Sequence, residues 1–88
     1  SYEEAIICFD KVLQLNEKNE YAWRGKGFSE QALEKWEEAV YCFEKAIQIN
    51  ENDLYSLNSK GVCLQMLQKY DQALACFDKV LKLNEKDV

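Results

Sequence analysis

The stretch WEEAVYCFEKAIQINEND begins at Trp36, and it has two near-copies, YEEAIICFDKVLQLNEKN from Tyr2 and YDQALACFDKVLKLNEKD from Tyr70. The three copies are spaced by 34 residues without slippage, so equivalent positions are expected in equivalent surroundings. A fixed period between about 20 and 50 residues is typical of stacked supersecondary units. The sequence therefore predicts a repeat architecture, and it directs the search for function to surfaces rather than to a catalytic cleft.

Each copy has the periodicity of an amphipathic helix. In the copy that begins at Trp36, apolar residues recur at i, i+3, i+4 and i+7, which places them on one face of a helix. We expect helices over 2–15, 36–49 and 70–83, with helix-like segments over 20–33 and 54–67. Each copy then reaches an asparagine that is a candidate for a left-handed C-terminal cap. These asparagines are Asn16, Asn50 and Asn84.

The intervening segments carry interior glycines that recur at the same period, Gly27 and Gly61. Glycine inside a helix costs about 1 kcal/mol relative to alanine. Its recurrence indicates that a missing side chain is required at this position. We therefore expect the two helices of each hairpin to approach closely, with the glycine facing a small residue, Ala39 or Ala73, of the other helix.

The cysteines are interpreted as small apolar fillers beside the phenylalanine stripe. Cys8, Cys42 and Cys76 lie one repeat apart, about 10 Å in a stack of helices, and this separation exceeds what a disulfide tolerates. The chain has no histidine and no CxxC pair, so the usual spacing of zinc ligands is missing. We expect these three and Cys63 to remain reduced thiols.

Composition and charge narrow the classes of partner. The 88 residues carry 11 basic and 16 acidic side chains, a net charge of −5, with no run of like charge longer than a pair. A nucleic-acid footprint needs clustered lysine and arginine, so no nucleic-acid partner is expected, which also disfavours an RNA-reading helical repeat. No apolar stretch approaches the roughly 20 residues of a membrane span, and no signal peptide is recognisable. We expect one small cytoplasmic domain with no membrane contact.

Catalysis has little support in the sequence. Histidine, the common general base, is absent, and Ser29, Ser56 and Ser59 have no paired base. There is no glycine-rich phosphate loop. Carboxylate pairs such as Glu37 and Glu38 suit the first turn of a helix, where they complement its dipole. We predict that the chain is not an enzyme and has no catalytic residue, metal site or cofactor.

The repeated residues resemble the tetratricopeptide repeat (TPR), a family of 34-residue helix–turn–helix units. The middle unit supplies Trp23, Gly27, Trp36, Ala39, Phe43 and Ala46. The last unit supplies Leu57, Gly61, Leu64, Tyr70, Ala73, Phe77 and Val80. The first copy has only the second helix of a unit, with Tyr2, Ala5, Phe9 and Val12. The resemblance implies an all-α fold of five antiparallel helices stacked as a right-handed α-solenoid, divided into 1–19 (the second helix of a truncated repeat), 20–53 and 54–87.

Two departures from the family pattern matter. Glu30 stands where the family places a large apolar residue, as Leu64 does in the next unit. We expect either that this helix packs loosely or that Glu30 reaches solvent. Proline is absent, and Glu17, Glu51 and Glu85 occupy its usual place. Because proline cannot continue a helix, its absence weakens the stop between units.

The resemblance also implies a protein-interaction scaffold, because the first helices of such units line a concave groove. The groove-facing positions, spaced along one face of each helix, are Tyr21, Arg24, Phe28, Gln31, Tyr55, Asn58, Val62 and Gln65. Tyrosine and arginine are enriched in interface hot spots. We expect a protein or peptide partner to bind here, and the charge of Arg24 to favour an acidic segment. The family's carboxylate clamp is not expected, because two of its positions fall on Phe28 and Ser59.

The alternative function is a structural module that assembles with itself. Helix 2–15 has an apolar stripe that a further helix would cover, and helix 70–83 leaves leucines open at the other end. The stripe is Ala5, Phe9 and Val12, and the leucines are Leu74, Leu81 and Leu83. Burying such surface is favourable. We expect the 88 residues to self-associate through these ends or by exchanging helices, which is a low-cost route to dimers.

Overall fold

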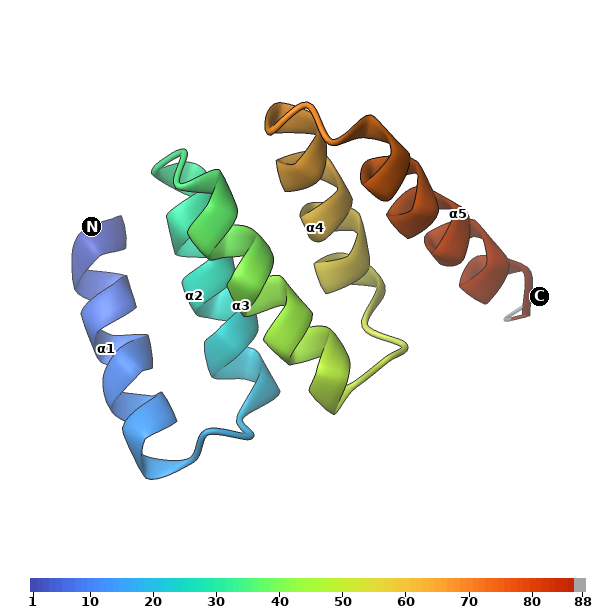
Figure 1. The fold of residues 1–88 in the computed structure, drawn as a ribbon. Coiled ribbons are helices and arrows are strands. Elements are labelled where there is room, and N and C mark those ends of the chain that lie inside the picture. The colour runs from blue at the N-terminus through green and yellow to red at the C-terminus, as the bar shows by residue number, and fades with distance from the viewer. Residues whose placement is uncertain (87–88) are drawn as a thin grey trace.

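The computed structural model describes residues 1–86, and these residues form five helices and no strand. The helices are α1 (Tyr2–Leu15), α2 (Glu20–Ala32), α3 (Trp36–Ile49), α4 (Leu54–Met66) and α5 (Tyr70–Lys86). Consecutive helices run antiparallel and follow one another in a row, so that α1 and α5 lie at its opposite ends (Figure 1). The all-α, repeat-stacked solenoid predicted from the sequence is confirmed.

Short polar side chains begin three of these helices. The side-chain oxygen of Asn19 accepts a hydrogen bond from the Ala22 backbone N–H at 3.1 Å, and Asp53 accepts one from the Ser56 N–H at 3.1 Å. Ser1 caps α1 in the same way. Each cap satisfies a backbone donor that has no partner inside the helix. The starts of α2 and α4 are therefore fixed locally.

The asparagines after α1 and α3 do not adopt the left-handed conformation predicted for them. Asn16 has φ −150° and Asn50 has φ −135°, both in the extended region. Their side chains instead accept hydrogen bonds from the N–H groups of Lys18 and Asn52. Asparagine side chains often turn the chain in this way, without a left-handed residue. The prediction was also wrong for Asn84, which lies inside α5.

The left-handed residues lie at the other turns, between α2 and α3 and between α4 and α5. Glu34 has φ 60° and Gln68 has φ 63°. In each turn the N–H of the next residue donates a hydrogen bond to a carbonyl of the preceding helix. These bonds run from Lys35 N–H to Glu30 C=O and from Lys69 N–H to Leu64 C=O, both 2.8 Å. This is the Schellman pattern, which usually has glycine at the left-handed position.

We expect Glu34→Gly and Gln68→Gly each to raise the free energy of unfolding by about 0.5–1 kcal/mol. A side chain in the left-handed region costs about 1–2 kcal/mol, and the larger unfolded-state entropy of glycine offsets part of that gain. Urea denaturation followed by circular dichroism measures the effect. Lys35→Gly is the matched control, because Lys35 has φ −89°, and it should destabilise the chain. A gain for Lys35→Gly equal to that for Glu34→Gly would contradict this account.

The core is centred on the hairpin of α2 and α3 and on its contact with α4. Phe43, Ala39 and Cys63 are fully buried together. The recurring glycines do mark the close approach of helices, but their neighbour is a phenylalanine and not the alanine that we expected. A Cβ on Gly27 would lie 2.9 Å from the Phe43 ring, and one on Gly61 would lie 2.6 Å from the Phe77 ring. Each ring therefore fills the space that the missing side chain leaves.

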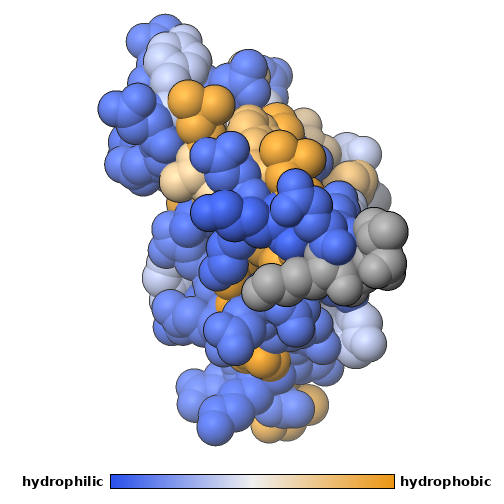
Figure 2. All heavy atoms as spheres, turned by 90° about the vertical axis from the view of Figure 1, so that its right-hand side faces the viewer, coloured by the Kyte–Doolittle hydropathy of each residue, from blue (hydrophilic) through white to orange (hydrophobic). Residues whose placement is uncertain are grey.

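The two ends of the row are less well covered than its middle. Helix α1 contributes no buried residue. On α5, Leu74 is 59% exposed and Leu81 is 60% exposed. Seen from the α5 side, most of the surface is polar and apolar side chains gather mainly in its upper part (Figure 2). Apolar surface at both ends agrees with the basis of the predicted self-association, which itself stays a prediction.

Glu30 is buried, which corrects the expectation of a loose helix or a solvated carboxylate. Its side chain is only 7% exposed. The Cys42 thiol on α3 donates a hydrogen bond to Glu30 Oε1 at a sulfur–oxygen distance of 2.9 Å. In the next unit, Leu64 and Cys76 pack together at the equivalent positions. A polar pair thus replaces an apolar pair in the same place.

The four cysteines are free, and they differ in burial. Cys42, Cys63 and Cys76 are buried, in agreement with their interpretation as fillers. Cys8 is exposed, so that interpretation was wrong for α1. The reason is that no described helix covers the side of α1 on which Cys8 lies.

Candidate functional site

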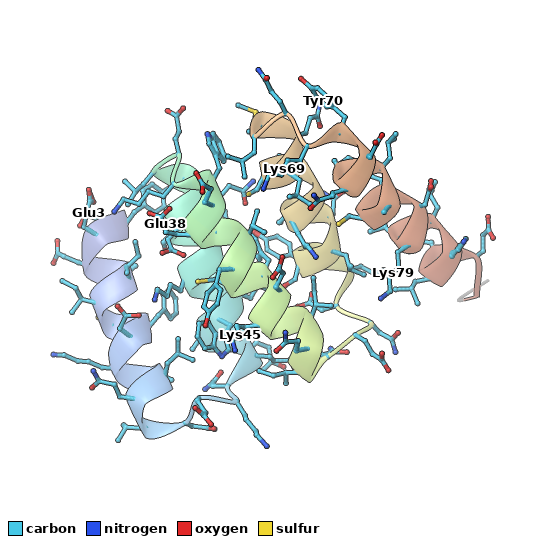
Figure 3. The ribbon with its side chains drawn as sticks, in the orientation of Figure 1. Glu3, Glu38, Lys45, Lys69, Tyr70 and Lys79 are labelled. Atoms are coloured by element: carbon cyan, nitrogen blue, oxygen red, sulfur yellow. The ribbon has the colours of Figure 1, made fainter. Side chains whose placement is uncertain are left out.

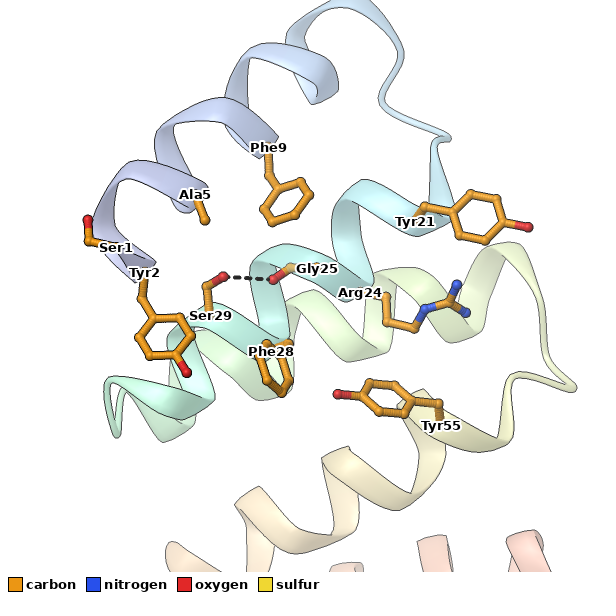
Figure 4. A pocket seen from close by; sticks show the side chains of 10 residues that line it. All are labelled: Ser1, Tyr2, Ala5, Phe9, Tyr21, Arg24, Gly25, Phe28, Ser29 and Tyr55. Atoms are coloured by element: carbon orange, nitrogen blue, oxygen red, sulfur yellow. Dashed lines mark hydrogen bonds between the residues drawn. The ribbon is translucent and has the colours of Figure 1, made fainter.

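An open, mainly apolar cavity of about 770 Å³ lies between α1 and α2 and reaches α4. Figure 4 shows its walls, with side chains of α1 on one side, those of α2 behind them and Tyr55 of α4 opposite. Ser29 donates a hydrogen bond to the Gly25 carbonyl, so its hydroxyl is satisfied within α2. The lining residues are Ser1, Tyr2, Ala5, Phe9, Tyr21, Arg24, Gly25, Phe28, Ser29 and Tyr55.

The structure brings half of the predicted binding residues into this cavity. Tyr21, Arg24, Phe28 and Tyr55 all line it. The remaining four lie outside it, farther along the same two helices. They are Gln31 on α2 and Asn58, Val62 and Gln65 on α4. These four residues therefore do not form the walls of the cavity.

Aromatic side chains dominate the cavity and remain available to a ligand. Tyr21 is 68% exposed, and Phe28 and Tyr55 are each 47% exposed. The rings of Tyr2 and Phe28 meet edge to face, with centroids 6.2 Å apart. The ring of Tyr55 meets the buried ring of Phe43 in the same way at 6.3 Å. These contacts hold the rings of Tyr2, Phe28 and Tyr55 in place, although each of the three residues is at least 45% exposed.

Arg24 does not present a free charge to the cavity. Its Nη1 lies 3.1 Å from Oδ2 of Asp53, which is buried at the start of α4. The same carboxylate accepts a 2.6 Å hydrogen bond from the Ser56 hydroxyl. The guanidinium carbon also lies 4.8 Å from the centre of the Tyr21 ring. Because the charge is compensated within the chain, the expected preference for an acidic segment loses its basis.

Sequence reasoning predicted Ala5 and Phe9 of α1 as an open stripe for self-association and not as part of the binding surface, and it did not identify Gly25. Gly25 does not recur, because Ser59 occupies the equivalent position in the next unit. A Cβ on Gly25 would clash with the ring of Phe9. The absence of a side chain at Gly25 thus lets α1 lie against α2. The signal for this contact in the sequence was a glycine inside a helix that is not repeated in the next unit.

Two lysines, Lys26 and Lys60, join successive units on the other side of α2 and α4. Lys26 Nζ lies 2.7 Å from Asp10 Oδ1 of α1, and Lys60 Nζ lies 3.6 Å from Glu44 Oε1 of α3. Burial by itself would lower the pKa of Lys26, but the hydrogen bond with Asp10 and nearby negative charges raise it overall. Other charged side chains, such as Glu38, Lys69 and Lys79, point outward from the helices (Figure 3).

Within residues 1–86, no three cysteine and acidic side chains gather closely enough to hold a metal ion. None of the described helices has the length and apolar character needed to cross a membrane.

Comparisons with known proteins place this geometry in a family. Models of the tetratricopeptide repeat match residues 1–19, 20–53 and 55–87. The second TPR of Spaghetti (RPAP3), bound to the HSP90 peptide SRMEEVD, is 24% identical, with a TM-score of 0.90 over 93% of this chain and 76% of that one. A crystal structure of MamA is 23% identical, with a TM-score of 0.94 over 98% of this chain and 50% of that one.

A third solved structure, the TPR domain of Arabidopsis OM64, is 21% identical, with a TM-score of 0.89 over 93% of this chain and 68% of that one. No curated protein sequence matches the chain. The chain thus spans about three quarters of the Spaghetti domain and half of MamA. At these identities the likeness establishes the fold, and it does not transfer any partner.

Proposed function

The chain belongs to the tetratricopeptide repeat family, and we propose that it is a non-catalytic scaffold that binds a protein or peptide partner across α2 and α4. The observation that carries this proposal is the open apolar cavity with exposed aromatic walls. Aromatic side chains are enriched at interface cores and hot spots. The proposed surface comprises Tyr21, Arg24, Phe28, Gln31, Tyr55, Asn58, Val62 and Gln65.

Recognition at this surface rests on aromatic contact more than on charge. Arg24 is paired with Asp53, so the cavity offers four exposed rings, those of Tyr2, Tyr21, Phe28 and Tyr55. The partner segment is therefore one with apolar or aromatic side chains. An acidic chaperone tail is a poor fit, because Phe28 and the buried Ser59 stand at two of the carboxylate-clamp positions.

Selection from a phage-displayed library of random twelve-residue peptides tests the proposal. We expect enriched peptides that carry aromatic or large aliphatic residues, and Tyr21→Ala with Tyr55→Ala should weaken their binding more than tenfold. Tyr41→Ala is the matched control. Tyr41 is an equally exposed tyrosine on α3, outside the cavity, and its loss should leave binding unchanged. The peptide SRMEEVD is a second probe, for which no saturable binding is expected.

These variants avoid a complication at Arg24. Reversing its charge would leave the buried Asp53 facing a second carboxylate, and a lost signal would then report unfolding. The proposal is refuted if the selected peptides bind the Tyr21/Tyr55 double variant as well as they bind the parent chain. Sensitivity to Tyr41→Ala would place the site on the face of α3.

A further inference from the structure

A second cavity, of about 500 Å³, lies where residues 16–19 and the first turns of α2 meet the end of α3. It shares no lining residue with the cavity between α1, α2 and α4. Trp23 and Ile49 form its apolar wall, and its other lining residues are charged or polar. These are Glu17, Lys18, Lys45 and Gln48.

The Trp23 ring is held in place by three contacts. Its Nε1–H donates a hydrogen bond to the Glu17 carbonyl at 2.7 Å. The ring meets that of Tyr41 edge to face, with centroids 6.0 Å apart, and Lys26 Nζ lies 6.0 Å from its centre. Trp23 is nevertheless only half-buried, and Tyr41 is 55% exposed. A ring that is already fixed loses little conformational entropy when a ligand packs on it.

This aromatic pair departs from the repeat, and the fold does not require it. Leu57 and Ala75 stand at the equivalent positions, 34 residues later. Leu57 is buried in the core, so a large apolar residue is enough for packing at the first position. Ala75 is exposed, so the second position needs no side chain beyond a methyl group. Trp23 and Tyr41 therefore give the middle unit a surface that the next unit lacks.

The lysines of this cavity are available to a ligand. Among residues 1–86, neither Lys18 nor Lys45 forms an ion pair with a carboxylate. Lys45 Nζ lies 5.4 Å from the centre of the Tyr41 ring, which places its charge beside the aromatic pair. Glu17 is the one acidic residue of the lining, so the cavity has an excess of positive charge in a chain of net charge −5. Arg24, by contrast, is compensated within the chain.

We propose that a second surface binds a segment of a partner protein in which acidic residues flank an aromatic residue. This surface, called the Trp23 surface below, is formed by Lys18, Trp23, Tyr41, Lys45 and Ile49. The partner's aromatic side chain packs on the apolar wall, where aromatic pairs are favourable beyond the area that they bury. Its carboxylates face the two lysines, and complementary charge of this kind steers and orients docking.

The inference goes beyond the proposed function, because the Trp23 surface is separate from the surface of α2 and α4. The two surfaces also differ in the segment that they select. The first selects apolar or aromatic side chains and needs no acidic residue, whereas the Trp23 surface needs an aromatic residue and carboxylates together. The peptide SRMEEVD fits neither, because it has carboxylates but no aromatic side chain.

The probe is the acetylated peptide GSEDEFEDGS, titrated into the ¹⁵N-labelled chain under reducing conditions. Two matched peptides are GSEDEAEDGS, without the ring, and GSQNQFQNGS, without the charges. We expect a saturable shift of the Trp23 indole N–H. The indole of Trp36 is the internal reference, because Trp36 lies at the opposite end of α3 from Ile49. Each matched peptide should bind at least about tenfold more weakly, since it loses either the aromatic contact or the charge complementarity.

Variants of the chain locate the contact. Lys18→Gln with Lys45→Gln should weaken binding of GSEDEFEDGS at least about tenfold, and Tyr41→Ala should have an effect of similar size. The matched control is Lys79→Gln with Lys82→Gln. It removes the same number of charges from exposed positions on α5, and it should change the affinity by no more than about twofold, because exposed charges at a distance are screened.

Two outcomes would overturn the inference directly. One is the absence of a saturable shift at the Trp23 indole. The other is equal binding of GSEDEFEDGS and GSEDEAEDGS, or equal losses in the two lysine double variants, since the peptide would then be attracted by overall charge alone.

The double variant Tyr21→Ala with Tyr55→Ala separates the two proposals. It should bind GSEDEFEDGS as the parent chain does. If it loses this peptide, the peptide lies in the cavity between α1, α2 and α4, so the inference fails and the proposed function stands. If it keeps both this peptide and the library peptides, the proposed function fails and the Trp23 surface stands.

Discussion

Phe43→Ala is expected to lower the free energy of unfolding by about 3–5 kcal/mol, much more than the same change at the equivalent positions, Phe9 and Phe77. Loss of a fully buried phenylalanine removes its transfer free energy and leaves a cavity. Phe43 is fully buried between Gly27 and the α4 side of the core, whereas Phe9 and Phe77 are half-buried. The expected loss is comparable to the whole stability of a small domain, so the Phe43 variant should be largely unfolded at 37 °C.

Urea denaturation followed by circular dichroism at 222 nm gives the three values under one set of conditions. The residue and its repeat position are the same in each variant. Differences among the three losses of stability therefore report how many helices cover the ring. We expect about 1–3 kcal/mol for Phe9→Ala and Phe77→Ala, in proportion to their smaller buried area. Three equal losses would show that position within the row does not determine packing, contrary to the structure.

The fold was predictable from the sequence because its main determinant is periodic. A period of 34 residues and the apolar spacing within each copy identified the helices at 2–15, 20–33, 36–49 and 54–67 to within a residue or two. The exception was the end of α5. We predicted a helix end at Asn84 from the type of that residue alone. Asparagine ends a helix only where the following chain turns away, so the residue type does not determine the end.

The turns were harder to predict, since the residues in them are not those that their conformations favour. Asn16 was assigned the left-handed state for its type, yet its side chain satisfies the Lys18 N–H from an extended backbone. Glu34 and Gln68 adopt the left-handed state although neither is glycine or asparagine. In both hairpins the packing of one helix on the other requires a tight turn, and tertiary structure overrides the local preference.

The repeat pattern did not predict which equivalent residues are buried either. Cys8 and Cys42 are equivalent by period, but one is exposed and the other is buried. Periodicity assigns each residue to a face of its helix, whereas burial depends on whether another helix lies on that face. The same limit hid the cavity, because Ala5 and Phe9 of its α1 wall were predicted only as an open apolar stripe for self-association. Glu30 shows the converse. We expected a loosely packed helix or a solvated carboxylate, but Glu30 is buried and the Cys42 thiol donates a hydrogen bond to it.

Between pH 9 and pH 10.5, the free energy of unfolding is expected to fall by roughly 3–4 kcal/mol because of two buried thiols, with TCEP present throughout. Burial raises the pKa of Cys63 from 9.0 to about 11. Burial, followed by the hydrogen bond to Glu30, raises the pKa of Cys42 still further. A thiol whose pKa is higher in the folded state than in the unfolded state stabilises the fold. This contribution is fully present at pH values below the pKa of the thiol in the unfolded state. That stability is lost as pH rises, because unfolding then releases protons.

The slope of stability against pH identifies the groups responsible. Each thiol that ionises only after unfolding contributes about 1.4 kcal/mol per pH unit above its unfolded pKa. Replacing Cys42 or Cys63 with alanine should remove one such contribution from the slope, even though either change also lowers stability at neutral pH by leaving a cavity. A slope that neither replacement changed would contradict the burial of these two thiols.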